Sequence, residues 1–143
     1  MKNEVRIGKE VINLANQIKR EIGKESAEYG ITSIQGRIIG FLYWEASKRD
    51  IFQKDIETEF NIRRSSVTSV LQLMEKNELV KRASVSEDAR LKKIILTEKG
   101  VEIQEHVHKC IDKLEKELSE GFTDDEINVF LHFINRVSKK IRE

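Results

Sequence analysis

The chain contains no proline, one cysteine and one tryptophan among its 143 residues. Without proline, no helix is forced to bend or end at a ring that cannot donate a backbone hydrogen bond. The single cysteine, Cys110, excludes an internal disulfide and fits a reducing compartment, so we expect a cytoplasmic protein. No apolar run reaches the length of about eighteen residues that a membrane span needs, and the N-terminus lacks a signal-peptide core. We therefore expect neither a membrane segment nor a secretory signal.

Signatures of catalysis are also missing. The sequence has no glycine-rich phosphate loop, no nucleophile elbow and no HExxH zinc motif. Its carboxylates alternate with lysines on the expected helices, which is typical of a solvated face. We therefore predict that the protein is not an enzyme and has no catalytic residues and no cofactor.

Charge is abundant and unevenly distributed. Charged residues make up 36% of the chain and apolar residues 38%, which suits long helices whose apolar faces need a partner. Residues 61–96 hold eight basic and four acidic side chains, a local charge of +4 in a chain whose net charge is +1. A basic segment in an otherwise mildly acidic chain is the electrostatic pattern of a phosphate-binding surface.

The segment 51–96 predicts a winged helix-turn-helix. Residues 53–60 are expected to form a short helix, 61–63 the turn, and 64–76 a second helix with apolar residues at helical spacing. Arg64 stands at the start of this helix, and short hydrogen-bonding side chains without any acid lie on or beside its other face: Ser65, Ser66, Thr68, Ser69 and Gln72. Such side chains let a helix approach base edges and phosphates in a major groove, although an ordinary amphipathic helix with a serine-rich outside would look the same.

Two strands are expected after this helix, because residues 79–84 and 92–97 are rich in β-formers. The polar segment 85–91 between them predicts a hairpin tip, and Arg90 is its only basic residue. Together with the two helices, these strands would complete the wing.

Short motifs mark the same region and its flanks: Leu71-Gln72-Leu73-Met74-Glu75-Lys76, Asp88-Ala89-Arg90, Leu96-Thr97-Glu98-Lys99-Gly100 and Ile31-Thr32-Ser33-Ile34-Gln35. In this order they closely resemble the MarR family of bacterial transcriptional regulators. The resemblance covers nearly the whole chain, since length and helix order match as well. One departure lies at Asn77-Glu78-Leu79, where the family usually has a glycine before the first strand.

The resemblance implies a mainly α-helical fold with a small β-wing, in a single MarR-like domain over residues 1–143. Residues 31–97 would form the winged helix-turn-helix DNA-binding lobe, and residues 4–30 and 98–143 a helical dimerisation lobe. It further implies a homodimeric repressor that binds an inverted repeat in double-stranded DNA. By the same resemblance, Arg90 would reach into the minor groove with Asp88 holding its guanidinium, and a small phenolic or aromatic effector would release the DNA.

Three long helices are expected outside the DNA-reading segment, over residues 4–28, 98–119 and 124–141. Narrow apolar stripes run along them, at Ile7–Ile22, Ile103–Leu118 and Ile127–Ile141, and favour packing against helices of a second subunit. On the last helix we expect burial of Ile127, Phe130, Leu131, Ile134, Val137 and Ile141. Thr32 and Thr123 each begin a capping-box motif, and Thr97 is the expected cap of the helix after the wing.

Two aromatic residues, Tyr43 and Trp44, lie near the end of the helix expected over residues 33–47. We expect both to pack in the core with their polar ends at the surface. The alternative is that they form one wall of an effector pocket.

Histidine and cysteine residues raise two other functions. His106 and Cys110 share a helical face, which raises a metal site completed by His132, and Cys110 alone raises a redox sensor. Cys110 lies within an apolar stripe, where a cysteine is usually a small buried hydrophobe, so we predict no metal site. A winged-helix module that binds protein is a further alternative, which weak dependence of binding on salt would distinguish.

Overall fold

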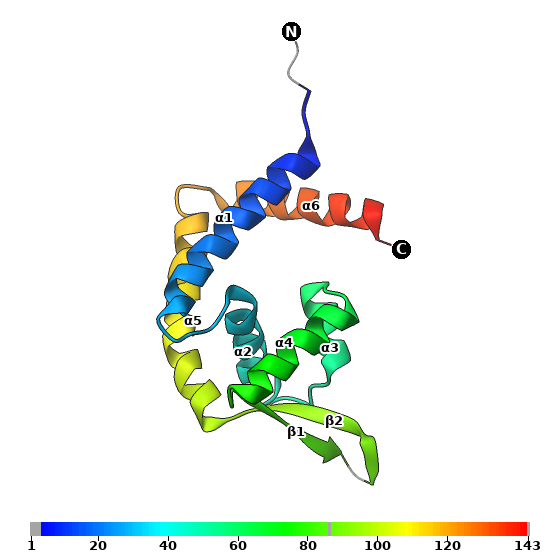
Figure 1. Cartoon of the computed structure of the whole chain (residues 1–143). Helices are drawn as coiled ribbons and strands as arrows, with labels where there is room; N and C mark the ends of the chain where they lie inside the picture. Colours follow the sequence, from blue (N-terminus) through cyan, green and yellow to red (C-terminus); the bar gives the residue numbers. More distant parts are fainter. Residues whose placement is uncertain (1–3, 86, 143) are drawn as a thin grey trace. The chain divides into compact units, whose positions relative to one another are not determined.

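The computed structural model describes residues 4–85 and 87–142, without the side chains of Glu25, Asp88 and Ala89. The elements follow in the order α1 (Ile7–Ala27), α2 (Ser33–Glu45), α3 (Gln53–Phe60), α4 (Arg64–Lys76), β1 (Val80–Val85), β2 (Asp88–Leu96), α5 (Glu98–Ser119) and α6 (Asp124–Ile141) (Figure 1). This confirms the predicted class, mainly α with a small β-wing. The chain divides into two compact units, Met1–Ile111 and Asp112–Glu143. None of the helices in the described segments has the length and apolar content that a membrane crossing requires.

Side chains one turn apart fix the starts of several helices. At α2, Thr32 Oγ1 accepts from the backbone N–H of Gln35 at 3.3 Å while Gln35 Oε1 accepts from the N–H of Thr32 at 3.0 Å. The same reciprocal pair joins Thr123 and Glu126 at α6, with distances of 3.1 and 2.9 Å. Both predicted capping boxes are therefore present, and each satisfies two backbone donors that a helix start leaves without a partner.

One apolar cluster holds the first unit together. Its buried members come from α2, α3, α4, the wing, the first half of α5 and the segments that connect them: Ile31, Ile38, Ile39, Leu42, Ile51, Ile56, Val67, Leu71, Met74, Leu79, Val80, Ile94, Ile103 and Val107. Helix α4 contributes Val67, Leu71 and Met74, which confirms its predicted apolar face. The opposite face of α4 is consequently turned away from this core.

The wing is an antiparallel pair in which β1 and β2 match residue for residue from Val80↔Leu96 to Ser84↔Lys92. The register then shifts, and Val85 pairs with Asp88. The prediction that the second strand begins at residue 92 is therefore wrong, because β2 begins at Asp88, beyond a shift in register between Ser84 and Val85. The wing is also tied to the start of α3, since the N–H of Ile94 donates to the carbonyl of Ile51 at 2.7 Å.

The junction of α4, β1 and α5 explains the Leu-Thr-x-x-Gly motif. Thr97 Oγ1 accepts from the N–H of Gly100 at 3.1 Å, so Thr97 caps α5 as predicted. The carbonyl of Leu79 accepts from the N–H of Thr97 at 3.1 Å. The Thr97 hydroxyl donates to the carbonyl of Glu78, with the Leu79 carbonyl as a longer second acceptor at 3.1 Å. A Cβ on Gly100 would lie only 2.5 Å from the Leu79 carbonyl oxygen. Only glycine lets the first turn of α5 approach the start of β1 this closely.

Glu78 stands at the same junction with φ of +61°, in the left-handed region. This is the position where the family resemblance led us to expect glycine. The chain therefore keeps the backbone conformation that glycine favours while carrying a side chain there.

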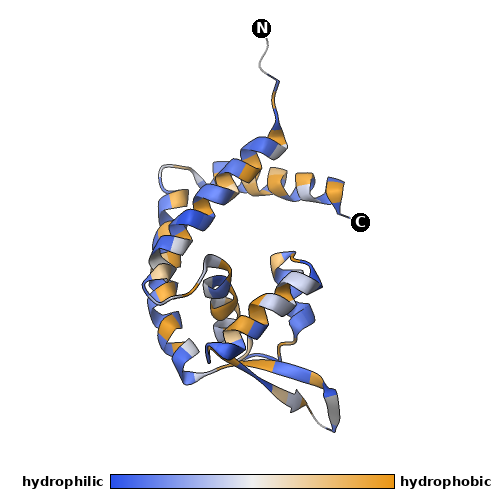
Figure 2. Ribbon diagram, viewed as in Figure 1, coloured by the Kyte–Doolittle hydropathy of each residue, from blue (hydrophilic) through white to orange (hydrophobic). Residues whose placement is uncertain are grey.

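The apolar stripes at the two ends of the chain are largely exposed. On α1, Ile7 is 55% exposed, and among the described apolar side chains of this helix only Ile22 is buried. Figure 2 shows apolar residues along both α1 and α6. On α6, Phe130, Leu131, Ile134 and Ile141 are all exposed, so the expected burial of this face does not occur within one chain. A unit made of two helical segments encloses too little volume to form its own core.

Candidate nucleic-acid interface

Helix α4 has two faces of opposite character. Val67, Leu71 and Met74 are buried, whereas most of the residues proposed from the sequence are exposed: Arg64, Ser65, Ser66, Ser69 and Gln72. Thr68 is half-buried at the edge of this face. The exposed face carries no acidic side chain, and Glu75 at its flank is bound by Arg82, with 2.7 Å between Arg82 Nε and Glu75 Oε1. The face therefore presents small polar groups and a cation to whatever approaches it.

Two hydroxyl groups of this face are hydrogen-bonded to the backbone of α4. Ser69 Oγ donates to the carbonyl of Ser65 at 3.2 Å, and Thr68 Oγ1 donates to the carbonyl of Arg64 at 2.9 Å. Thr68 Oγ1 also accepts from Gln53 Nε2 at 2.7 Å. Sequence reasoning missed Gln53. The only available signal was a long amide side chain at the first residue of the preceding helix.

The basic residues of segment 61–96 do not all serve one surface. Arg82 is paired with Glu75, and Lys93 Nζ lies 3.5 Å from Asp50 Oδ1. Other cations of the segment are exposed on α4 and the wing: Arg63, Arg64, Lys76, Lys81, Arg90 and Lys92. The charge count therefore overstates the phosphate-binding surface that the sequence predicts, because acids of the same lobe engage at least Arg82 and Lys93.

Arg90 lies within β2, between the paired residues Asp88 and Lys92, and is exposed. The prediction that Arg90 sits in the hairpin tip is therefore wrong, because β2 begins at Asp88 and includes residue 90. The side chain of Asp88 is outside the described residues, so its expected contact with Arg90 stays a prediction.

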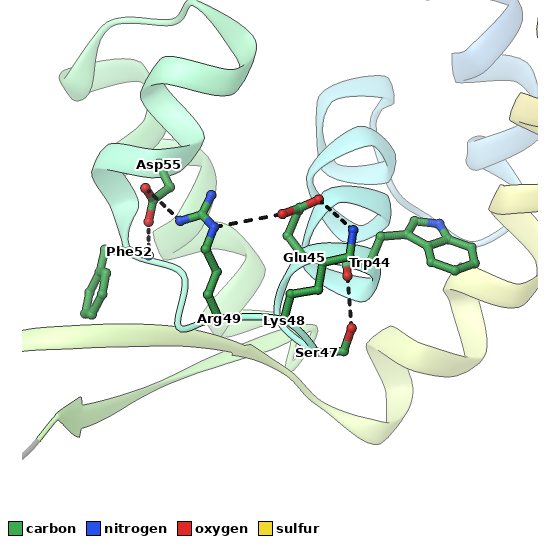
Figure 3. Close-up of polar contacts among 7 residues, drawn as sticks. All are labelled: Trp44, Glu45, Ser47, Lys48, Arg49, Phe52 and Asp55. Atoms are coloured by element: carbon green, nitrogen blue, oxygen red, sulfur yellow. Dashed lines mark hydrogen bonds and ion pairs between the residues drawn. The ribbon is translucent and has the colours of Figure 1, made fainter.

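A polar network missed from the sequence joins α2 to α3 (Figure 3). Arg49 Nη1 lies 3.1 Å from Asp55 Oδ1, and its Nε lies 3.9 Å from Glu45 Oε2. Asp55 Oδ2 also accepts from the backbone N–H of Phe52 at 2.8 Å. Each such surface pair contributes little by itself, but together they connect the end of α2 to the start of the helix-turn-helix.

Tyr43 and Trp44 are exposed, at 38% and 51%, so the expectation that they pack in the core is wrong. Their rings meet edge to face at 5.2 Å, and the Trp44 ring meets His108 of α5 at 5.4 Å. These rings lie outside the apolar cluster because Ile38, Ile39 and Leu42 already fill the face of α2 that points into it. Their role in an effector pocket stays a prediction.

The residues considered for metal or redox chemistry lie on α5 and α6. His106 stacks on Tyr29 with ring centroids 5.2 Å apart, and Cys110 is half-buried. Within residues 4–85 and 87–142, no three His, Cys, Asp or Glu side chains gather in a group that could hold a metal ion.

These features define a winged helix-turn-helix protein. The family model of the MarR family matches residues 29–91, which contain α2, α3, α4, β1 and the start of β2. The chain is 28% identical to the HTH-type transcriptional regulator YwoH of Bacillus subtilis over 130 residues, covering 88% of this chain and 92% of that protein. It is also 28% identical to the transcriptional regulator ZitR of Lactococcus lactis over 149 residues, with 92% and 100% covered.

Solved structures show the same fold. The regulator MarR from Oenococcus oeni matches with a TM-score of 0.83 and 25% identity, over 94% of this chain and 99% of that one. MepR of S. aureus, in a complex with DNA, matches with a TM-score of 0.90 and 20% identity, over 99% and 100%. The winged helix-turn-helix lobe of this chain therefore resembles that of the MarR family. Over most of its length the chain is similar to helix-turn-helix transcriptional regulators.

Proposed function

We propose that the protein is a cytoplasmic, homodimeric transcriptional repressor that binds an inverted repeat in double-stranded DNA. Helix α4 would enter the major groove, where the residues of its exposed face and edge would contact phosphates and bases: Arg64, Ser65, Ser66, Thr68, Ser69 and Gln72. The observation that carries this proposal is the polarity of α4, whose apolar face is buried while an acid-free face of short polar side chains is exposed.

A second copy of the chain would cover the exposed apolar stripes. Contiguous apolar surface on a long helix is costly in water and marks a contact surface. Residues 4–30 and 98–143 would form the dimerisation lobe, in which Ile7, Leu118 and Phe130 exchange solvent for partner helices. A two-fold dimer presents two copies of α4, and its symmetry demands an inverted repeat in the DNA.

The wing would add contacts outside the major groove. Arg90, exposed near the distal end of the wing, would reach the adjacent minor groove, with Asp88 holding its guanidinium. Narrow A·T-rich grooves attract such a cation most strongly.

A small phenolic or aromatic effector would release the DNA by changing the spacing of the two reading heads. Tyr43 and Trp44 would form one wall of its site. Their exposed rings and the contact of Trp44 with His108 support this placement.

The proposal is tested by selecting bound sites from random duplex DNA and then changing their spacing. We expect an inverted repeat with half-site centres roughly 10 base pairs apart, and loss of most affinity when about five base pairs are inserted between them. Binding should also weaken steeply as salt is raised. A single half-site bound at full strength by a monomer contradicts the proposal, and binding without salt dependence points to a protein-binding module instead.

The dimer is tested by placing charge in the stripes. The double variant Leu114→Glu with Val137→Glu should sediment as a monomer and lose affinity for the full site. The matched control, Asn128→Glu with Asn135→Glu, adds two carboxylates to exposed polar positions of α6 and should stay dimeric. Equal behaviour of the two double variants would show that the stripes do not form the interface.

A further inference from the structure

A short hydrogen-bonded chain joins α3 to the first turn of α4. Gln53, the first residue of α3, donates from Nε2 to Thr68 Oγ1 at 2.7 Å and, with a longer contact of 3.4 Å, to the carbonyl of Arg64. Thr68 Oγ1 in turn donates to the same carbonyl at 2.9 Å. Gln53 and Thr68 are fifteen residues apart, so this link exists only in the folded lobe.

The partners determine the polarity of each bond. A backbone carbonyl can only accept, which places the nitrogen of the Gln53 amide, and not its oxygen, toward Arg64 and Thr68. A hydroxyl has one proton to donate and two lone pairs that accept. In Thr68 the proton is used by the carbonyl of Arg64, and one lone pair is used by Gln53. What remains is a single lone pair, so Thr68 can accept one further hydrogen bond and donate none.

We propose that Gln53 is a positioning residue for sequence recognition, because it holds the Thr68 hydroxyl as an acceptor that meets a base amino group in the major groove. In that groove, adenine offers the N6 amino donor and cytosine the N4 amino donor, whereas guanine and thymine present acceptors to the same place. Thr68 is half-buried and not enclosed, so a base edge on this face can reach it. This assignment rests on the proposed DNA binding by α4.

Ser69 shows why Gln53 matters. Its Oγ donates to the carbonyl of Ser65 at 3.2 Å, and none of the described residues supplies it with a side-chain donor like the amide of Gln53. A hydroxyl held by one bond can rotate to donate to a phosphate or to guanine at little cost. Thr68 cannot rotate in this way, because its proton is already bound to the carbonyl of Arg64. It therefore cannot donate to guanine or thymine, which present acceptors.

The experiment deletes single amino groups from the DNA. A site is first selected from random duplexes with the full-length protein. Each adenine in a half-site is then replaced by purine, and each cytosine by 2-pyrimidinone, so that only the exocyclic amino group is removed. One position should weaken wild-type binding by roughly threefold to tenfold, the range expected for one hydrogen bond.

Variants assign that position to the pair. Thr68→Val should abolish the effect of the amino deletion, and Thr68→Ser should retain it, because serine keeps the hydroxyl. Gln53→Met keeps the side-chain length without the amide, so it should reduce the preference for adenine or cytosine over guanine or thymine at this position. Thr58→Val, the same loss of a hydroxyl at an exposed position of α3, should leave the profile unchanged.

The outcomes separate this assignment from the proposed function. A wild-type protein that enriches no DNA sequence overturns both. A protein that enriches a site, but whose Thr68→Val and Gln53→Met variants show the wild-type profile, overturns the role of Gln53 alone. Should Gln53→Met unfold, the comparison of Thr68→Val with Thr68→Ser still decides whether the hydroxyl reads an amino group.

Discussion

Replacing Glu78 by glycine should stabilise the protein, although it removes a side chain. Glu78 has φ of +61°, where a Cβ crowds the following carbonyl oxygen. Its hydrogen bonds belong to the backbone: the N–H donates to the carbonyl of Glu75 at 3.0 Å, and its own carbonyl accepts from Thr97 Oγ1. Glycine keeps both bonds and removes the crowding, so the conformational term decides the result.

The expected size follows from two opposing terms. The left-handed conformation costs a residue with a Cβ about 1–2 kcal/mol, and glycine removes that cost. Glycine also gives the unfolded chain more freedom, which costs about 0.5–1 kcal/mol on folding. The difference is a net gain of about 0–1.5 kcal/mol for Glu78→Gly.

Asn77 is the matched control because it is adjacent, exposed and has φ of −87°. There glycine relieves no crowding, so Asn77→Gly should lose about 0.5–1 kcal/mol. Urea unfolding monitored by far-UV circular dichroism measures both changes as shifts of the midpoint at constant m value. All samples need one protein concentration, because stability that includes association depends on it. A loss of stability of similar size in both variants would refute the argument that Glu78 occupies a glycine-like position.

Other perturbations separate folding from binding. Leu71→Ala should lose about 2–5 kcal/mol in urea unfolding because its side chain is fully buried, whereas the exposed Gln72→Glu should keep the wild-type midpoint and abolish DNA binding in gel-shift assays. The reverse result would mean that the two faces of α4 are assigned wrongly. Arg90→Ala should lower the slope of log affinity against log salt by about one unit, and an unchanged slope would remove this side chain from the phosphate contacts. Phenolic compounds that release DNA should quench the fluorescence of Trp44, the single tryptophan, and release without quenching would place the effector site elsewhere.

The elements of the DNA-reading segment could be predicted from the sequence because local interactions determine them. Helices α3 and α4 have the expected bounds, Gln53–Phe60 and Arg64–Lys76. Their apolar spacing and the hydrogen bonds of capping residues act within one or two turns, so they can be read along the chain. The exposed polar face of α4 follows from the same spacing. The β-forming residues predicted the wing, and the family resemblance marked Asn77-Glu78-Leu79 as a departure where a glycine is usual.

Which side chains of different helices and strands contact one another could be seen only in the tertiary structure and not in the sequence. The pairing of Gln53 with Thr68, of Lys93 with Asp50, and the approach of Gly100 to Leu79 join residues that are far apart in the sequence, where no local pattern marks them. The start of β2 depended on a register shift in the ladder and not on β-propensity.

Burial of the long helices could not be predicted from the sequence either. Helical periodicity shows which face of a helix is apolar, but burial depends on what covers that face. Phe130 and Ile134 of α6 therefore have the pattern of core residues while remaining exposed in the single chain, and Trp44 remains exposed because the inward face of α2 is already filled. Periodicity is a property of one segment, whereas burial is a property of the surfaces that pack against it.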